Sequence, residues 1–312
     1  MRIVFMGTPE FAVPSLKALI REGYEVVGVF TQPDRPKGRG NKLTPSPVKV
    51  AATEAGIPVY QPERIRKTGV EDLRSLKPDL CVTAAFGQIL SKEILDIPPM
   101  GNINVHASLL PKHRGAAPIA YAIMAGDAKA GVTTMMMDAG IDTGDILLQE
   151  ETGIAESETC GELTVRLSGI GAELLIRTIR AMEAGSLKRI PQDEAKMTYD
   201  PMMTKELSRP DWNRDAAEIR GLINGLNPWP CVSVPYEGGR LKLLRAASPS
   251  IITGCLSVFT GFLSVRTGLF PKRTGLFSFI QVPFRNPFLP GSHALSGNLP
   301  LSSVFRPVPG VP

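Results

Sequence analysis

Cysteine is scarce in this sequence, and the spacing of the few cysteines excludes two classes of protein. Among 312 residues there are four, Cys81, Cys160, Cys231 and Cys255, and none forms a C-x-x-C pair. Zinc modules and disulfide scaffolds both need closely spaced or numerous cysteines. The sequence therefore implies no metal site and no disulfide framework, and we expect a reducing, cytoplasmic location.

Long apolar runs are also missing. Hydrophobic residues make up 43% of the chain and charged residues 21%, as in soluble globular proteins. The segment 251–265 is too short and too rich in Ser, Thr and Gly to cross a bilayer, which takes ~20 mostly apolar residues. Residues 2–6 already form an apolar strand pattern, so we expect no signal peptide and no membrane partner.

A dinucleotide-binding motif is absent as well. Gly7-Thr8-Pro9 follows the first apolar run, but the G-x-G-x-x-G pattern that cradles a pyrophosphate does not occur there. We interpret these residues as a tight strand-to-helix turn, with Pro9 near the first helical turn.

Acidic residues are absent from 247–312. The chain carries 35 lysines and arginines against 30 acidic residues, for a net charge of +5. Five of the basic residues lie beyond Ala246, so the charges of the preceding part balance and the whole excess belongs to the tail. The tail also repeats one pattern imperfectly, Arg-Thr-Gly-Leu-Phe at 266–270 and 273–277.

The first half of the chain alternates apolar strand patterns with helical spacing. This alternation predicts βαβ units and a mostly parallel, Rossmann-like α/β sheet with helices on both faces. We expect a catalytic domain over 1–185, a polar linker over 186–207, and a second domain over 208–312 that is atypical from 247. Strands are expected at 2–6, 24–31, 58–60, 79–84, 102–106, 132–137, 146–149, 232–236 and 240–245, and helices at 10–21, 46–55, 68–76, 92–95, 160–184 and 215–226.

The strand at 102–106 carries the most informative pattern. Asn104 and His106 are two residues apart and therefore project from the same side of the strand. A later segment, Asp142-Thr143-Gly144-Asp145, could supply a carboxylate that orients the imidazole. Such a trio can stabilise an oxyanion and move a proton, as acyl or formyl transfer to an amine requires. An isolated histidine is more often a buried structural residue, but Asn104 and the Asp142 segment favour catalysis.

A basic loop over 33–47 is the second chemical feature. It holds Arg35, Lys37, Arg39 and Lys42, with glycines at 38 and 40 and prolines at its ends. Such a loop suits contacts with nucleic-acid phosphates. An ordinary solvated surface loop remains the alternative.

Five separated segments of the chain resemble the methionyl-tRNA formyltransferase family, and together they span about 1–246. They are the opening RIVFMGTPEFAVPSL, TQPDRPKGRGNKLTPSPVK (31–49), NINVHASLLPKHRGAAPI (102–119), MMMDAGIDTGDIL (135–147) and NPWP (227–230). The third segment is shared with other enzymes that use 10-formyltetrahydrofolate. The second and the last narrow the resemblance to the tRNA enzyme.

The resemblance implies specific roles. Asn104, His106 and Asp142 would be catalytic, and the formyl group of 10-formyltetrahydrofolate would pass to the α-amine of methionyl initiator tRNA. It also implies a C-terminal β-barrel of OB type that helps to hold tRNA, and we expect a monomer. The folate would contact Phe86, Gly87, Gln88, Ile89, Leu90, Ser108, Leu109, Leu110 and Pro111, and the tRNA would contact Arg35, Lys37, Arg39 and Lys42.

Smaller features allow more than one interpretation. Lys112, His113 and Arg114 could neutralise a phosphate or the folate glutamate, or form a solvated turn. We expect Trp212 and Trp229 to be packing anchors of the second domain.

The tail departs from the family. We favour a frameshift or a wrong reading frame, which would leave the barrel incomplete, over a divergent folded barrel or a basic nucleic-acid tail. Two alternative functions also stay open: a folate-dependent formyltransferase that acts on a small amine, and an RNA-binding relative with impaired catalysis.

Overall fold

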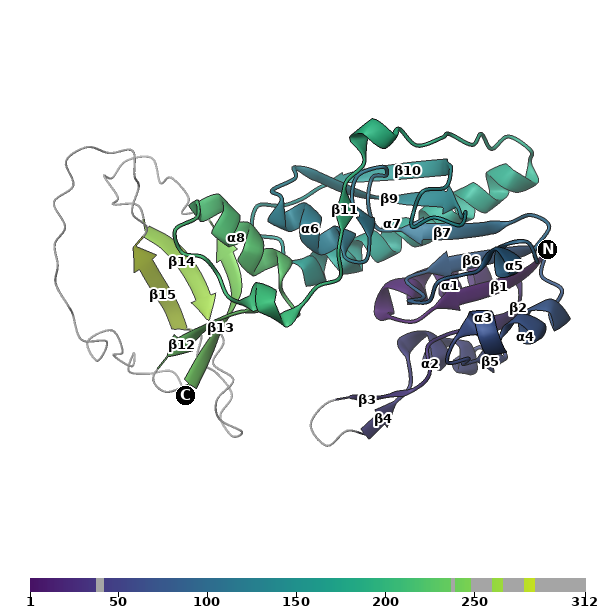
Figure 1. The fold of residues 1–312 in the computed structure, drawn as a ribbon, viewed down its shortest axis with the longest axis horizontal. Coiled ribbons are helices and arrows are strands. Elements are labelled where there is room, and N and C mark those ends of the chain that lie inside the picture. Colours follow the sequence, from purple (N-terminus) through teal and green to yellow (C-terminus); the bar gives the residue numbers. More distant parts are fainter. Residues whose placement is uncertain (38–41, 237–238, 248–259, 266–277, 284–312) are drawn as a thin grey trace.

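A seven-stranded sheet forms the centre of the first domain (Figure 1). The computed structural model describes the chain except for residues 38–41, 237–238, 248–259, 266–277 and 284–312. The strand order is β10-β9-β7-β6-β1-β2-β5. The last five strands of this order run parallel, and β9 and β10 are antiparallel additions at one edge. The strands are β1 Arg2–Gly7, β2 Glu25–Phe30, β5 Val59–Tyr60, β6 Leu80–Ala84, β7 Asn102–His106, β9 Lys129–Met136 and β10 Ile146–Gly153.

Helices cover both faces of the sheet, which confirms the predicted Rossmann-like class. Side chains of a strand alternate between faces. Ile3 and Phe5 of β1 therefore join one apolar cluster, and Val4 and Met6 join another. The first cluster includes residues of α1 Val13–Arg21, α2 Pro47–Glu54 and α7 Cys160–Glu183. It also includes residues of the short 3-10 helix η1 Glu10–Ala12, which leads directly into α1. The second includes α3 Ile65–Thr68, α4 Val70–Ser75 and α5 Lys92–Leu95.

The second domain combines one helix with an antiparallel sheet. Helix α8 Ala216–Gly225 buries Ile219 and Ile223 against Val232, Leu241 and Leu243. Strands β12 Val232–Tyr236, β13 Gly239–Ala247, β14 Thr260–Val265 and β15 Ser278–Pro283 pair in chain order. Among the described residues β12 and β15 do not pair, so this part of the expected barrel is an open sheet. Apart from β14 and β15, the interpretations of the tail concern residues that lie outside the described part of the chain.

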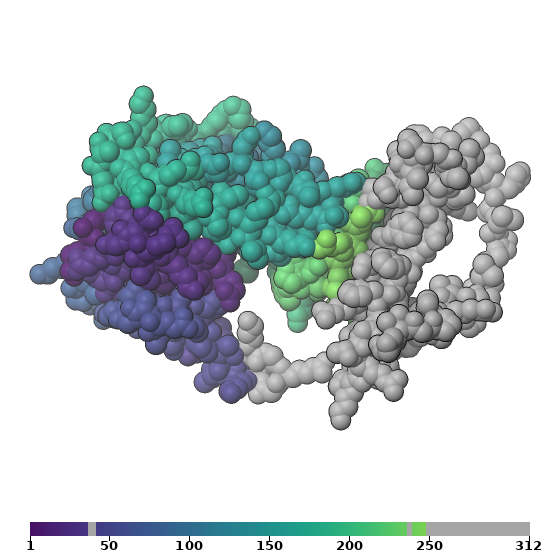
Figure 2. Space-filling view, turned by 180° about the vertical axis from the view of Figure 1, so that it is seen from behind, coloured from purple at the N-terminus to yellow at the C-terminus, as the bar shows by residue number. Residues whose placement is uncertain are grey.

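The two domains meet through α6 Pro118–Met124 and the start of α7. Helix α8 packs closely on α6 at Gly225. A Cβ at this position would lie 2.6 Å from Met124 Cγ, so the contact requires a residue without a side chain. The main chain of Asn227 accepts a hydrogen bond from Gly161 at 2.9 Å. Figure 2 shows, from behind, the green second domain adjoining the teal part of the first.

Several elements were not anticipated. Helix α6 has a proline in its first turn and few polar residues to outline a face, and it was not predicted. The expected linker is partly ordered into η2 Glu194–Lys196, β11 Tyr199–Asp200 and η3 Lys205–Ser208. Strand β11 pairs in parallel with β8 Arg114–Gly115, so the linker lies against the first domain.

The prediction that the two tryptophans anchor the packing of the second domain is wrong. Trp212 is 47% exposed and Trp229 is 53% exposed. Across the described ranges, no helix combines the length and apolarity needed to cross a membrane.

Candidate active site at the carboxyl end of strand β7

Strand β7 places Asn104 and His106 at the edge where ligands bind in open parallel sheets. Thr83 of β6 lies beside Asn104 on one side, and β9 pairs with β7 on the other. The side chains of Asn104 and His106 are buried, with residue exposures of 9% and 6%. The sheet therefore fixes both groups near its carboxyl edge, with little freedom to reorient.

Asp142 reaches the same point from the turn after β9. Its carboxylate Oδ1 lies 3.4 Å from Asn104 Nδ2 and 3.6 Å from His106 Nδ1. Its Oδ2 accepts a hydrogen bond from the main-chain N–H of Gly115 at 2.9 Å. The structure thus brings the three predicted catalytic side chains together.

The turn that carries Asp142 is tightly specified. Asp142 itself has a left-handed backbone with φ of 55°, and Gln192 Nε2 donates to the main-chain oxygens of Asp142 and Gly144, each at 2.8 Å. A Cβ at Gly144 would lie 1.8 Å from the main-chain oxygen of Met136, so this position requires glycine. Gln192 belongs to the linker and carries no motif, which is why the sequence did not point to it.

The ring of His106 has a defined hydrogen-bonding pattern. Its Nε2 lies 2.9 Å from the main-chain oxygen of His113. A carbonyl oxygen only accepts, so Nε2 carries the proton in this contact. In a neutral ring Nδ1 then has a free lone pair, and it faces the Asp142 carboxylate, which would stabilise a proton received there.

The segment 86–90 follows β6 and has a mixed character. Phe86 and Leu90 are buried, while Ile89 is 70% exposed. The side chain of Gln88 is occupied, because its oxygen accepts from Ile65 N at 2.7 Å and its nitrogen donates to Pro62 O at 3.0 Å. Gly87 has φ of +78°, and its carbonyl accepts from Gln32 Nε2 at 3.0 Å. Gln88 therefore fixes the segment, and Gly87 and Ile89 are its exposed members.

The segment 108–111 follows β7, the strand that neighbours β6. Ser108 Oγ donates to the main-chain oxygen of Lys112 at 2.7 Å, so its hydroxyl shapes the loop. Leu110 packs in a small cluster with Met135 and Ile146, and Leu109 and Pro111 are half-buried. Since β6 and β7 are parallel neighbours, the two predicted folate segments leave the sheet at one edge.

The basic loop forms a hairpin that projects from the domain (Figure 1). Strands β3 Arg35–Lys37 and β4 Lys42–Thr44 pair antiparallel. Asp34 anchors the base, with Lys49 Nζ at 2.7 Å and Gln61 Nε2 at 2.8 Å, and these contacts lower the pKa of its carboxyl. Arg35 and Lys42 are exposed, and Arg39 lies outside the described residues.

The turn Lys112-His113-Arg114 was expected either to neutralise a phosphate or the folate glutamate or to be solvated. Neither expectation holds for two of its residues. His113 and Arg114 are buried, with exposures of 9% and 2%. The guanidinium of Arg114 binds Gln192 at 2.8 Å and Glu194 at 2.7 Å, and this contact lowers the pKa of the Glu194 carboxyl. Arg114 therefore holds the linker, and only Lys112 is exposed.

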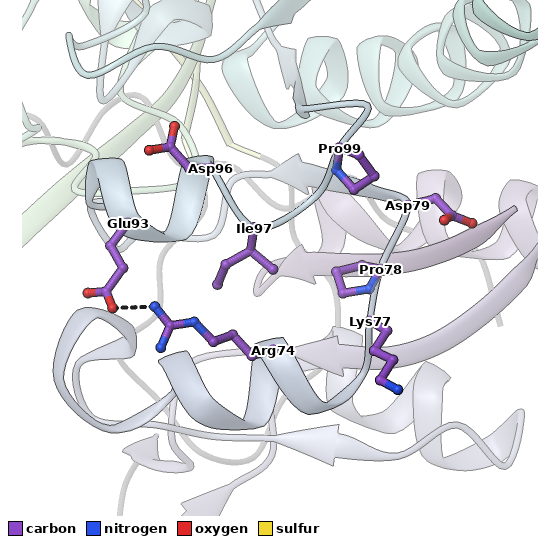
Figure 3. A pocket seen from close by; sticks show the side chains of 8 residues that line it. All are labelled: Arg74, Lys77, Pro78, Asp79, Glu93, Asp96, Ile97 and Pro99. Atoms are coloured by element: carbon purple, nitrogen blue, oxygen red, sulfur yellow. Dashed lines mark hydrogen bonds and ion pairs between the residues drawn. The ribbon is translucent and has the colours of Figure 1, made fainter.

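A hollow of about 650 Å³ lies at the opposite edge of the sheet, before β6 and β7 (Figure 3). An ion pair between Arg74 and Glu93 at 2.6 Å crosses one side of it. No predicted site residue lines this hollow, so we assign it no part in the chemistry. In the described portion of the chain, no group of three or more His, Cys, Asp or Glu side chains could hold a metal ion.

Comparisons with known proteins identify the family of this chain. Residues 1–179 match the family described as formyl transferase, and residues 202–258 match its C-terminal domain. The methionyl-tRNA formyltransferase of Alkaliphilus oremlandii is 51% identical over 247 residues, which cover 79% of this chain and 80% of the relative. That of Clostridioides difficile is 52% identical over 244 residues, which cover 78% and 79%.

Solved structures show the same fold at low identity. An N-formyltransferase from Helicobacter canadensis, in complex with folinic acid and dTDP-3-aminofucose, aligns with a TM-score of 0.64 at 19% identity, covering 84% of this chain and 94% of that one. A sugar 3N-formyl transferase, WlaRD, has a TM-score of 0.63 at 20% identity and covers 90% and 97%. On the sequence matches, this chain belongs to the formyl transferase family and, within it, to the methionyl-tRNA formyltransferases.

Proposed function

We propose that this protein transfers the formyl group of 10-formyltetrahydrofolate to the α-amine of methionyl initiator tRNA. The observation that carries the proposal is the convergence of Asn104, His106 and Asp142 at one end of β7. The family membership supports it, since relatives that match over about four fifths of their own length bear this enzyme's name. A neighbour in fold that binds folinic acid supports a reduced folate as the donor.

The reaction needs one bond made, one bond broken and one proton moved. The amine nitrogen attacks the formyl carbon, and the formyl oxygen becomes an oxyanion. The bond from the formyl carbon to N10 of the folate then breaks, and N10 takes up the proton that the amine has lost. Catalysis therefore requires a donor to the oxyanion and a group that can hold the proton in transit.

The three side chains match these needs. Asn104 Nδ2 has two hydrogens and directs one toward Asp142, so the other can donate to the formyl oxygen. His106 can take the proton on Nδ1, where the Asp142 carboxylate stabilises the resulting cation. Gly115 N–H holds the far oxygen of Asp142 and keeps the carboxylate in place.

The substrates would reach the trio from two sides. We assign the folate to the edge formed by 86–90 and 108–111, with Gly87, Ile89 and Leu109 as surface and the buried members as support. We assign the tRNA acceptor end to the β3–β4 hairpin and the second domain. Unpaired bases at a strand end are easier to recognise than the edges within an A-form groove.

We further propose the division into a catalytic domain over 1–185, a linker over 186–207 and a tRNA-binding domain over 208–312. The enzyme would act in the cytoplasm as a monomer. Size-exclusion chromatography with light scattering tests the oligomeric state, and a dimer mass at micromolar concentration would contradict it.

Single-turnover formylation tests the function. The purified chain is mixed with 10-formyltetrahydrofolate and methionyl initiator tRNA, and a nucleotide-sugar amine serves as the competing acceptor. Transfer to the tRNA is expected, and Asn104→Ala, His106→Ala or Asp142→Ala should lower its rate by ~10²–10³-fold with little change in folate binding. Preferred transfer to the sugar amine, or wild-type rates in all three variants, would refute the proposal.

A further inference from the structure

His113 is held on both sides by carboxylates. Its Nδ1 lies 2.8 Å from Asp200 Oδ2 and its Nε2 lies 2.9 Å from Asp127 Oδ2. Carboxylate oxygens accept hydrogen bonds, so both ring nitrogens must donate, and only the cationic ring can do this. The hydrogen bond to Asp200, followed by that to Asp127, raises the pKa of His113 although its burial acts in the other direction.

The main chain of the same residue touches the catalytic histidine. The His113 carbonyl accepts the hydrogen bond from His106 Nε2 at 2.9 Å. His113 N donates to Thr198 Oγ1 at 2.7 Å, and its φ of 59° lies in the left-handed region, which a non-glycine residue adopts at some cost. The side-chain contacts can hold this unusual conformation, and with it the direction of the carbonyl.

The two carboxylates come from different parts of the molecule. Asp127 follows α6 in the first domain, and Asp200 belongs to β11 in the linker. The linker is in close contact here, because Arg114 N donates to Thr198 O at 2.9 Å and Ala116 N donates to Asp200 O at 3.0 Å. A Cβ at Gly115 would lie 2.4 Å from Asp200 O, so the two strands have no room between them.

We propose that His113 is a positioning residue, whose imidazole is clamped between Asp127 and Asp200 so that its carbonyl fixes the ring of His106. The linker thereby forms part of the catalytic apparatus, since Asp200 supplies one side of the clamp. This inference rests on the proposed function, because it assigns the chemistry to His106. His113 acts through His106, which its carbonyl contacts.

The test compares variants of the full chain. His113→Ala removes the clamp, and Asp200→Asn keeps an acceptor oxygen while it removes the charge from the linker side. Asp193→Asn is the matched control, because Asp193 is on the same linker and, among the described residues, its carboxylate contacts Lys196 and the N–H of Ala195 within its own turn. A thermal melt of each variant establishes that it is folded.

The first readout is independent of activity. The chain has three histidines, so the ring nitrogen signals of His106 can be assigned by NMR with ¹⁵N-labelled histidine. We expect the Nε2 signal of His106 to shift in His113→Ala and Asp200→Asn and to stay unchanged in Asp193→Asn. An unchanged His106 signal in both clamp variants would overturn the proposal.

The second readout is kinetic. We expect kcat to fall by about 10–100-fold in the clamp variants with KM for both substrates within about twofold, because a misplaced catalytic group costs rate more than binding. In a His106→Ala background the same changes should cost less than about twofold. Equal losses in both backgrounds would show a merely structural role and overturn the inference. Wild-type activity of His106→Ala would instead refute the proposed function, and the NMR readout would still test the clamp.

Discussion

At the scale of single residues, the position of Asp142 depends mainly on neutral groups. Gly115 N–H and Asn104 Nδ2 donate to its carboxylate, and Gln192 holds its main chain. These donors stabilise a negative charge and fix its direction without introducing a second formal charge beside His106. The arrangement also depends on Gly144, whose backbone passes Met136 too closely for any side chain.

We therefore predict that Gly144→Ala displaces Asp142 and lowers kcat by ~10²-fold, as a misplacement of about 1 Å can do. Gly153→Ala is the control, since a Cβ at Gly153 meets nothing within 4 Å. Steady-state formylation rates of the two variants provide the measurement. A Gly144→Ala enzyme as active as the control would show that the turn does not set the carboxylate.

The clamp on His113 predicts a pH dependence of stability. The pKa of His113 is raised in the folded state, so its stabilising contribution is complete below the ordinary value of about 6.5 and is lost as pH rises through the folded value. The Tm difference between the wild type and His113→Gln should be largest near pH 6 and should narrow toward pH 9. Each kcal/mol lost corresponds to about 2–4 °C.

Other charged groups around His113 must be considered when these melts are interpreted. The hollows on its two sides are lined by Lys112 and Lys129, and by Glu206, Arg209, Asp211, Arg214 and Glu218. Wild type and variant share these groups, so only the difference between the two melting curves reports on the clamp. A difference that is constant from pH 6 to 9 would contradict the raised pKa.

The residues of the site were predictable where local pattern determined them. Strand alternation placed Asn104 and His106 on one side of the strand, and the family resemblance pointed to Asp142 as their partner. His113 was expected to face solvent or a ligand, but it is buried, because its partners Asp127 and Asp200 lie 14 and 87 residues away. Long-range pairing of this kind leaves no local signal in the sequence.

At the scale of elements, helix α7 approaches strand β7 closely and so helps to set its position. Gly171 faces the sheet at the point of contact, and a Cβ there would lie 2.9 Å from Val105 Cγ1 and 3.4 Å from Val132 Cγ1. Val105 lies between Asn104 and His106, so the packing of α7 bears directly on both.

We predict that Gly171→Val destabilises the fold by about 1–3 kcal/mol through overpacking and lowers activity further by moving β7. Gly169→Val in the same helix is the control, because nothing lies within 4 Å of its added Cβ. Urea unfolding and formylation rates measure both effects. Similar losses in the two variants would mean that helix propensity, and not the contact with β7, is responsible.

Elements with strong periodicity were predicted well, and those shaped by tertiary contacts were not. The strand over 102–106 and the helix over 92–95 match the structure residue for residue. Helix α6 and strand β11 escaped prediction, since one is nearly all apolar and the other is two residues long. Burial of α6 beneath α8 and pairing of β11 with β8 define them, and neither is local.

At the scale of the whole molecule, positive charge is unevenly distributed. The excess of positive charge lies beyond Ala246, and the hairpin adds Arg35 and Lys42 at an exposed position. The family match of the second domain ends at residue 258, so it does not extend to the rest of the tail. The DNA around codon 247 would test the frameshift interpretation directly.

We predict that Arg35→Ala with Lys42→Ala weakens tRNA binding. The slope of the logarithm of the binding constant against the logarithm of the salt concentration should become shallower by about one to two, because each lost phosphate contact removes about 0.7–0.9 from it. Arg66→Ala with Lys67→Ala is the charge-matched control on exposed α3. Filter binding from 50 to 200 mM salt provides the slopes. Equal slopes for the two double variants would place the tRNA elsewhere.

The linker contacts bear on where the gene could be cut. Gln192 and Asp200 lie beyond residue 185, yet they hold the Asp142 turn and the His113 clamp. A minimal fragment meant to keep the proposed catalytic centre complete should therefore stop after Asp200. A fragment that stops at 185 would keep the central sheet but would lose Gln192 and Asp200, which support that centre.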